Sequence, residues 1–165
     1  MKNKRDKKLQ RLCVNAVIGA LYAVLTILTA PIAYGPIQFR LSEAMVVLCA
    51  FMPRLGVGIT VGCLLANLFS TVTALDIIVG TLATALACLL TARCKKAWLA
   101  ILPNIIINTV MIGGMLAWVL MPKDFLLGFA INGAQVALGE ITVMVFLGIP
   151  LFAFAKRTRF LEKLL

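Results

Sequence analysis

The stretch Gly35-Pro-Ile-Gln-Phe-Arg-Leu-Ser-Glu-Ala44 places Arg40 and Glu43 between two apolar segments. The mean hydropathy of the chain is +1.06, so ionisable side chains in this position are costly and point to a function. Gly35 and Pro36 at the start of the stretch break the preceding helix. The stretch therefore separates the first two helices and is the first place to look for a site.

The composition indicates an integral membrane protein. The 165 residues are 62% hydrophobic and 13% charged, which is about half the charged fraction of a soluble domain. The formal charge of +10 is carried at the ends of apolar segments, so we interpret it as an orientation signal and expect no nucleic-acid partner. The first apolar run is too long for a signal-peptide core, and we expect nothing to be removed from the chain.

Residue types that many enzymes need are missing from the sequence. The chain has no histidine, and its five cysteines are scattered through mostly apolar runs. We interpret the cysteines as small hydrophobic residues and expect neither a metal site nor a cofactor. No Gly-rich sequence ends in Gly-Lys-Ser/Thr, so ATP hydrolysis would have to come from other subunits.

Six apolar runs predict the fold, since a bilayer core of about 30 Å needs about 20 helical residues. They cover residues 12–33, 41–52, 55–71, 75–92, 97–121 and 126–155. The second run is too short to span the membrane as an α-helix. We expect residues 34–40 to fold back into the outer half of the bundle and fill the remaining depth. The prediction is one all-α membrane domain, a six-transmembrane-helix bundle with a re-entrant outer loop between helices 1 and 2.

The positive charges predict the orientation of this bundle. With a cytoplasmic N-terminus, all 16 Lys and Arg residues except Arg40 and Lys123 lie in inside segments, as the positive-inside rule requires. We expect residues 1–11 and 156–165 to be basic cytoplasmic ends and residues 12–155 to form the bundle.

Polar residues gather at the outer and middle depths of this topology. Glu140 falls near the midplane, where an isolated carboxylate costs about 3 kcal/mol, so a partner or a ligand must compensate it. It shares a helix face of roughly 140° with Asn132 and Gln135. The other members of the group are Gln38, Arg40, Glu43, Asn67, Asp76 and Asn108.

Each of these residues also has a structural interpretation. Glu43 can pair with Arg40 at i, i+3 in a first helical turn. Asp76 and Thr73 have the spacing of a capping box. Three asparagines suit hydrogen bonds between helices, namely Asn67, Asn104 and Asn108.

Small residues form close-packing stripes on two predicted helices. One stripe lies on the first helix and comprises Ala16, Gly19, Ala20 and Ala23; the other lies on the third and comprises Gly58, Gly62 and Ala66. Together with the segment Ile37-Gln-Phe-Arg-x-Ser-Glu-Ala44 and the pattern Gly62-x-x-x-Ala66-Asn67, these features give a resemblance over essentially the whole chain. The chain resembles the substrate-binding (S) components of energy-coupling-factor (ECF) transporters, and among them the QueT family.

The resemblance implies one subunit of a four-part importer in the bacterial plasma membrane. The S component captures its substrate on the outer side, beneath the loop between helices 1 and 2. A transmembrane coupling subunit grips the small-residue face of helix 1, where Ala16 and Ala20 match the family's motif and Gly19 and Ala23 extend the same face. Two ATPase subunits then drive the S component to topple in the lipid and release the substrate inside.

The implied substrate is a queuosine precursor, either preQ1 (7-aminomethyl-7-deazaguanine) or a relative such as preQ0 or queuine. A carboxylate can accept paired N–H donors from a guanine-like edge, and a cationic arm favours a second carboxylate. We assign Glu140 to the ring edge and Glu43 or Asp76 to the amine. Asn67, Asn108 and Gln135 are expected to orient the ring. Phe39 or Trp118 is expected to stack on it, although Trp118 also suits an interface anchor, and Arg40, Asn132 and Gln38 complete the candidates.

Three other functions stay open at this point. An S component for a different vitamin-like ring would have the same fold, but a neutral vitamin would leave the acids without purpose. A membrane-embedded enzyme using carboxylates alone would convert its bound purine. A structural subunit without a ligand would fill its polar interior with its own hydrogen bonds.

Overall fold

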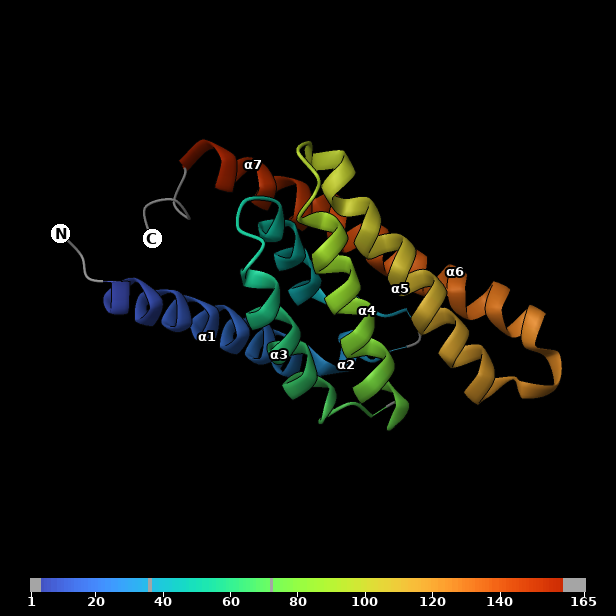
Figure 1. Cartoon of the computed structure of the whole chain (residues 1–165). Coiled ribbons are helices and arrows are strands. Elements are labelled where there is room, and N and C mark those ends of the chain that lie inside the picture. Colours follow the sequence, from blue (N-terminus) through green and yellow to red (C-terminus); the bar gives the residue numbers. More distant parts are fainter. Residues whose placement is uncertain (1–3, 36, 72, 159–165) are drawn as a thin grey trace.

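The computed structural model describes residues 4–158 except 36 and 72, and in this part of the chain every regular element is a helix (Figure 1). The cations Lys2, Arg159 and Lys163, predicted to be cytoplasmic, lie outside the described residues. In chain order the elements are α1 (Lys4–Leu28), α2 (Ala30–Ala33), the 3₁₀-helix η1 (Leu41–Ala50), α3 (Leu55–Asn67), α4 (Leu75–Thr91), α5 (Ala97–Leu120), the 3₁₀-helix η2 (Pro122–Asp124), α6 (Phe125–Val143), the π-helix η3 (Met144–Gly148) and α7 (Ile149–Thr158).

The described residues form seven α-helices and not the six helices predicted, because prolines divide two of the predicted segments and a third segment is a 3₁₀-helix. Pro31 has no N–H to donate to the carbonyl of Ile27, and α1 ends at Leu28 before the short α2 begins. Pro150 likewise leaves the carbonyl of Phe146 without its donor, and the chain widens into the π-helix η3 before α7 continues.

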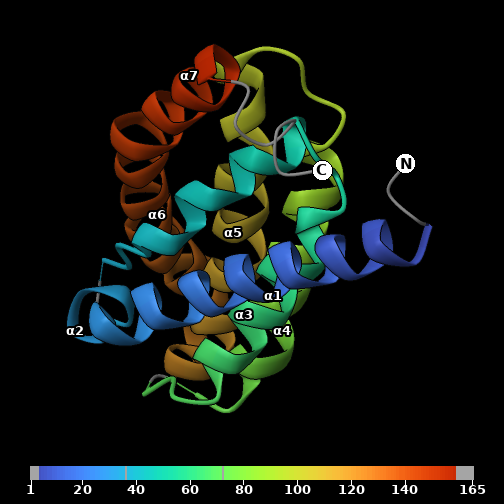
Figure 2. The same ribbon diagram turned by 90° about the vertical axis from the view of Figure 1, so that its left-hand side faces the viewer.

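The predicted second helix is a 3₁₀-helix, and it forms the centre of the molecule. Its 10 residues rise by about 2 Å each and cover about 20 Å, where an α-helix would cover about 15 Å. η1 contacts α1, α3, α4, α5, α6 and α7 and lies between α1 and α7 in the view of Figure 2. Because the surrounding helices cover it on nearly all sides, most of its residues are buried: Ser42, Glu43, Ala44, Val46, Val47, Leu48 and Cys49.

Helices α1 and α3 cross with their backbones in contact, and α1 passes in front of α3 and α4 in Figure 2. A Cβ atom added to Gly62 would lie 2.3 Å from the carbonyl oxygen of Gly19, and one added to Gly19 would lie 2.6 Å from that of Gly58. The backbone N–H of Gly58 also donates to Asn15 Oδ1 at 3.0 Å. Close approach at this crossing therefore depends on residues without side chains.

This crossing divides the small-residue stripe predicted on α1. Gly19 and Ala23 are buried within the chain, whereas Ala16 and Ala20 are exposed. Residues four apart share a face, and a step of three residues turns that face by about 60°. The prediction that all four residues form one face for the coupling subunit is therefore wrong. Gly19 and Ala23 pack inside the molecule, and only Ala16 and Ala20 lie on its outer surface.

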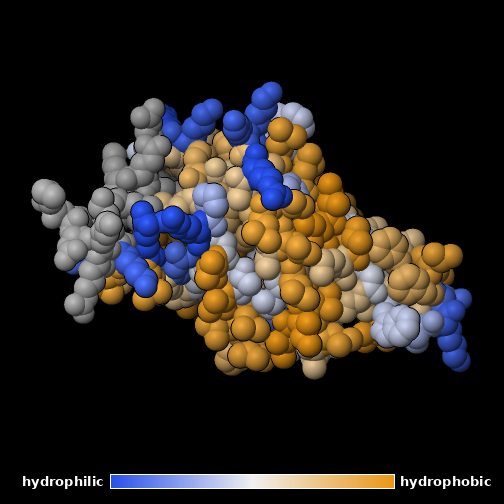
Figure 3. Space-filling view, in the orientation of Figure 1, coloured by the Kyte–Doolittle hydropathy of each residue, from blue (hydrophilic) through white to orange (hydrophobic). Residues whose placement is uncertain are grey.

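The length and surface of the helices identify a multi-pass membrane protein. Three segments are long and apolar enough to cross a membrane, namely Lys8–Leu28, Ala97–Leu120 and Pro122–Thr158, and η1, α3 and α4 are shorter apolar helices. Figure 3 shows a broad apolar band, with hydrophilic groups gathered towards the start of α1 and the turn before α5, and at the tip of the α5–α6 turn. Large apolar side chains on the exterior of the molecule are exposed, as lipid-facing residues are; Leu126 is 82% and Phe146 72% exposed.

The α1–α3 crossing can be tested by adding one methyl group. We expect Gly62→Ala to destabilise the protein by about 1–3 kcal/mol, because the backbone of Gly19 must move away. Gly114→Ala in α5 is the matched control, since its Cβ would meet nothing within 4 Å and alanine favours helix by up to about 1 kcal/mol. Thermal unfolding in detergent measures both variants, and equal midpoints would contradict the close crossing.

Candidate functional site

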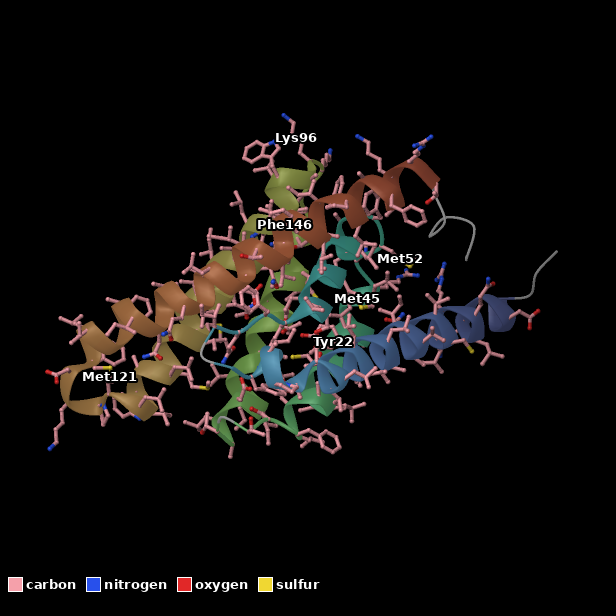
Figure 4. All side chains as sticks on the ribbon, turned by 180° about the vertical axis from the view of Figure 1, so that it is seen from behind. Tyr22, Met45, Met52, Lys96, Met121 and Phe146 are labelled. Atoms are coloured by element: carbon pink, nitrogen blue, oxygen red, sulfur yellow. The ribbon has the colours of Figure 1, made fainter. Side chains whose placement is uncertain are left out.

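Most of the polar residues predicted at outer and middle depth are buried in the bundle. Their side chains form three polar clusters around η1, two of which are joined by a hydrogen bond from Asn67 Nδ2 to Cys63 Sγ at 3.3 Å. We call these the ion-pair cluster (Tyr34, Arg40, Asn67, Ser70, Asp76), the Glu43 cluster (Tyr22, Glu43, Cys63, Thr84) and the Glu140 cluster (Asn104, Asn108, Glu140). Figure 4 shows Tyr22 of α1 close to Met45 of η1 in the middle of the molecule, away from Lys96 and Met121 at the two ends of α5.

The ion-pair cluster joins the loop before η1 to α3 and α4. Arg40 Nη2 donates to Asp76 Oδ2 at 2.7 Å, and the two side chains are 3% and 0% exposed. Ser70 Oγ donates to the same carboxylate oxygen at 2.8 Å, and Asn67 Nδ2 donates to the carbonyl of Asp76 at 3.0 Å. Gly80 leaves room for this cluster, because a Cβ there would lie 2.8 Å from both Asn67 Nδ2 and Asp76 Oδ1.

The loop of residues 34–40 is held on several sides. The Tyr34 hydroxyl donates to the carbonyl of Ala66 at 2.8 Å, and the Arg40 guanidinium lies 5.2 Å from the centre of the Tyr34 ring, within the range of a cation–π contact. The backbone of Gln38 lies against α6, where a Cβ on Gly139 would come within 2.3 Å of the Gln38 carbonyl oxygen. The loop therefore touches both α3 and α6.

Two of our structural interpretations are wrong in this region. The salt-bridge partner of Arg40 is Asp76 and not Glu43, because the loop directs the guanidinium towards α4. The carboxylate of Asp76 accepts from Arg40 and Ser70 and forms no capping box; Thr73 Oγ1 instead accepts from the N–H of Leu75 at 3.3 Å.

The Glu43 cluster lies in the fully buried contact between η1, α1, α3 and α4. Glu43 is 0% exposed, and its Oε1 accepts from the Tyr22 hydroxyl and, at 3.1 Å, from Thr84 Oγ1. Cys63 Sγ lies 3.2 Å from the same threonine hydroxyl. Oε2 of Glu43 has no partner among the described residues.

In the Glu140 cluster, two asparagines compensate the Glu140 carboxylate, which the sequence places near mid-depth. Asn104 Nδ2 donates to Glu140 Oε2 at 2.7 Å, and Asn108 Nδ2 donates to Oε1 at 3.1 Å. Both amide groups come from one face of α5, since the two residues are four apart. Their own oxygens, Asn104 Oδ1 and Asn108 Oδ1, have no partner within the described part of the chain.

The remaining predicted residues lie apart from these clusters. Asn132 is buried, but its Nδ2 donates to the carbonyl of Gly128 in its own helix at 2.8 Å. Gln135 and Phe39 are half-buried. Trp118 is 69% exposed, so it is wrongly placed as a stacking residue and suits the alternative of an interface anchor.

Sequence reasoning missed five members of the clusters. They are Tyr22, Tyr34, Cys63, Ser70 and Thr84, and it named Asn104 only as a link between helices. Tyr22 and Thr84 carry a weak signal, because each is a polar residue inside an apolar run that must find a hydrogen bond when buried. Nothing local indicates that both donate to the same carboxylate.

The three clusters offer acceptors and negative charge. Among the described Arg, Lys, Asp and Glu side chains, the buried ones are one guanidinium and three carboxyl groups. Five of the unpartnered buried atoms in these clusters are amide or carboxylate oxygens, on Glu43, Asn67, Asp76, Asn104 and Asn108. Buried acceptors of this kind usually find a donor, so the arrangement suits a compact ligand that has several N–H groups and a positive charge.

Comparisons with known proteins give one consistent result. The family model described as QueT transporter matches residues 12–157. The queuosine precursor transporter QueT of Lactococcus lactis subsp. cremoris (strain MG1363) is 41% identical to the chain over 71 residues. This alignment covers 42% of the chain and 41% of that relative's length. No solved structure matches the chain.

The ion pair between Arg40 and Asp76 generates a stability prediction. We expect Asp76→Asn and Arg40→Gln each to destabilise the protein by about 3–5 kcal/mol, because each leaves a buried charge without its partner. The double variant Arg40→Gln with Asp76→Asn should lose much less than the sum of the single losses. Thermal unfolding of the four proteins closes the cycle, and additive losses would show that the two side chains do not interact.

Proposed function

Because the chain belongs to the QueT transporter family, we propose that it is the substrate-binding subunit of an importer that takes up a queuosine precursor. The name of the Lactococcus relative supports this class of substrate. The observation that carries the proposal is the excess of buried acceptors and carboxyl groups around η1. A 7-deazaguanine with an aminomethyl arm supplies the missing N–H donors and a single positive charge.

The hydrogen bonds support separate roles for the acids. Asp76 already has a cationic partner in Arg40, so it has little need of a second one. Glu43 has no cation within hydrogen-bonding range among the described residues, and its Oε2 is unpartnered. We therefore assign the aminomethyl group of preQ1 to Glu43 and give Asp76 the task of holding the loop of residues 34–40.

The Glu140 cluster suits the guanine-like edge of the ring. A carboxylate oxygen can accept more than one hydrogen bond, so Glu140 can receive ring N–H groups while Asn104 and Asn108 hold its orientation. The same amides can then turn towards the ring oxygen. Gln135, Asn67, Gln38, Asn132 and Phe39 remain candidates for the walls of this site.

We further propose that the protein acts as an ECF S component in the bacterial plasma membrane, with both termini cytoplasmic. In this proposal η1 and the loop of residues 34–40 together take the place of one transmembrane helix, which makes six membrane segments with a re-entrant outer loop. The coupling subunit docks on the exposed side of α1 at Ala16 and Ala20. Two ATPase subunits supply the energy, and substrate release follows when the S component topples.

The proposed substrate can be tested with a ligand panel on the detergent-purified protein. We expect preQ1 to raise the thermal midpoint, since a ligand at 1,000 times its dissociation constant adds about 4 kcal/mol of stability. preQ0, queuine, guanine and riboflavin serve as comparisons. A shift with riboflavin alone would indicate another vitamin-like substrate, and no shift with any ligand would favour a subunit without a ligand.

The two carboxylate roles are separated by comparing preQ1 with preQ0, which has a neutral nitrile in place of the amine. Glu43→Gln should weaken preQ1 binding by about 30-fold or more, as expected for a buried charge pair that loses one partner, and leave preQ0 binding nearly unchanged. Glu140→Gln should weaken both ligands. Calorimetric titration measures each dissociation constant.

Asp124→Asn is the control for these variants, because it removes a carboxylate from the exposed α5–α6 turn. It should bind both ligands as the native protein does. If Glu43→Gln retained the native preference for preQ1 over preQ0, the assignment of the amine to Glu43 would be wrong.

A further inference from the structure

A groove with one basic end lies between α1 and α3 on the outside of the molecule. Its basic end is a hollow of about 590 Å³ lined by Lys8, Leu9, Arg11, Leu12, Asn15, Arg54 and Val57. A second hollow of about 350 Å³ shares Leu12, Asn15 and Val57 with the first and continues along the two helices towards Leu65. The shared residues make the two hollows one continuous groove.

The two ends of the groove differ in chemistry. Beyond Asn15, its walls are small or aliphatic side chains such as Ala20, Val61 and Leu65. At the other end, three exposed cations surround the hollow, and none of them forms an ion pair with a described carboxylate. Asp6 is the nearest acid along α1, but it lies roughly 160° around the helix from Lys8, so it does not neutralise the groove.

The floor of the groove is rigid. The Asn15 side chain donates from Nδ2 to the carbonyl of Arg11 at 3.0 Å and accepts from the N–H of Gly58 at 3.0 Å. The glycine contacts at the α1–α3 crossing hold the two backbones together along the apolar part. The apolar end therefore keeps its shape without an occupant.

The charge pattern identifies the occupant. Lys8 is the first residue of the apolar span of α1, so the basic end lies where the hydrocarbon core meets the headgroup layer. A phosphodiester there would meet three cations, and one acyl chain would follow the apolar part of the groove. We propose that this groove is a binding site for an anionic phospholipid, with the headgroup phosphate at Lys8, Arg11 and Arg54.

A lipid in this groove would affect docking of the proposed coupling subunit. Ala16 and Ala20 line the groove and also form the exposed side of α1 on which we place the coupling subunit. A bound lipid and a docking helix would then compete for the same surface. The lipid site itself does not depend on the identity of the transported substrate, because its residues lie outside the three polar clusters.

The test uses the full-length protein and two short-chain lipids, dioctanoyl phosphatidylglycerol and dioctanoyl phosphatidylcholine, with inorganic phosphate as a third ligand. Native mass spectrometry counts bound lipid, and thermal unfolding measures stabilisation. We expect phosphatidylglycerol to bind and stabilise the protein and the other two to have little effect. Replacing Lys8, Arg11 and Arg54 together by Gln should lower its affinity about 100-fold, which corresponds to about 3 kcal/mol.

Two further variants make the test specific to the groove. The matched control replaces Arg93, Lys95 and Lys96 by Gln, which removes three exposed cations from the turn between α4 and α5 and should leave the affinity nearly unchanged. Val57→Trp fills the groove at an exposed position without altering charge, and it should also reduce lipid binding.

Other outcomes would overturn the proposal. Equal losses in both triple variants would mean general attraction to basic residues, and equal stabilisation by phosphate would mean an ion site without an acyl chain. If the Lys8, Arg11 and Arg54 variant bound phosphatidylglycerol with unchanged affinity, the basic end of the groove would not hold the headgroup. preQ1 binding is measured on the same samples, so failure of the lipid site is distinguished from failure of the substrate proposal.

Discussion

The buried ion pair between Arg40 and Asp76 constrains the whole interior of this protein. Two charges at 2.7 Å with almost no exposure are stable only when each keeps its partner, because either alone would be very costly inside an apolar bundle. The pair therefore determines where the loop of residues 34–40 lies against α3 and α4. This loop leads directly into η1, so the position of the central helix follows from the pair.

The 3₁₀ geometry of η1 explains how one short element contributes Glu43 to one polar cluster and starts directly after Arg40 of another. With three residues per turn, side chains three apart form rows along the helix. Glu43, Val46 and Cys49 lie in one such row, so the carboxylate faces α1, α3 and α4 together with apolar neighbours. Arg40 precedes the helix and reaches α4 from its end. Movement of η1 relative to α4 would therefore disturb the contacts of Glu43 and of Arg40 with Asp76 together, which links these buried polar contacts to the packing of the bundle.

Helix α1 separates an inner function from an outer one. Its buried face supplies Tyr22 to Glu43, while its exposed face supplies Ala16 and Ala20 to the groove beside α3. Gly19 and Gly58 hold the two helices in contact between these faces. A change in the α1–α3 crossing would alter both the Glu43 cluster and the groove, so this crossing physically connects the buried polar interior with the outer surface.

Sequence alone determined the class of the protein, the approximate helix positions and the ionisable residues that matter. Apolar runs, charge at their ends and isolated polar residues are local properties of the chain. An ionisable residue inside an apolar run is recognisable from sequence because it is rare and costly there. Tertiary structure alone decided that Arg40 pairs with Asp76 and not with Glu43, that η1 is a 3₁₀-helix, and that Gly19 and Ala23 face inward while Ala16 and Ala20 face outward. These features depend on the rotation of each helix and on contacts between residues 36 positions apart, which no local pattern specifies.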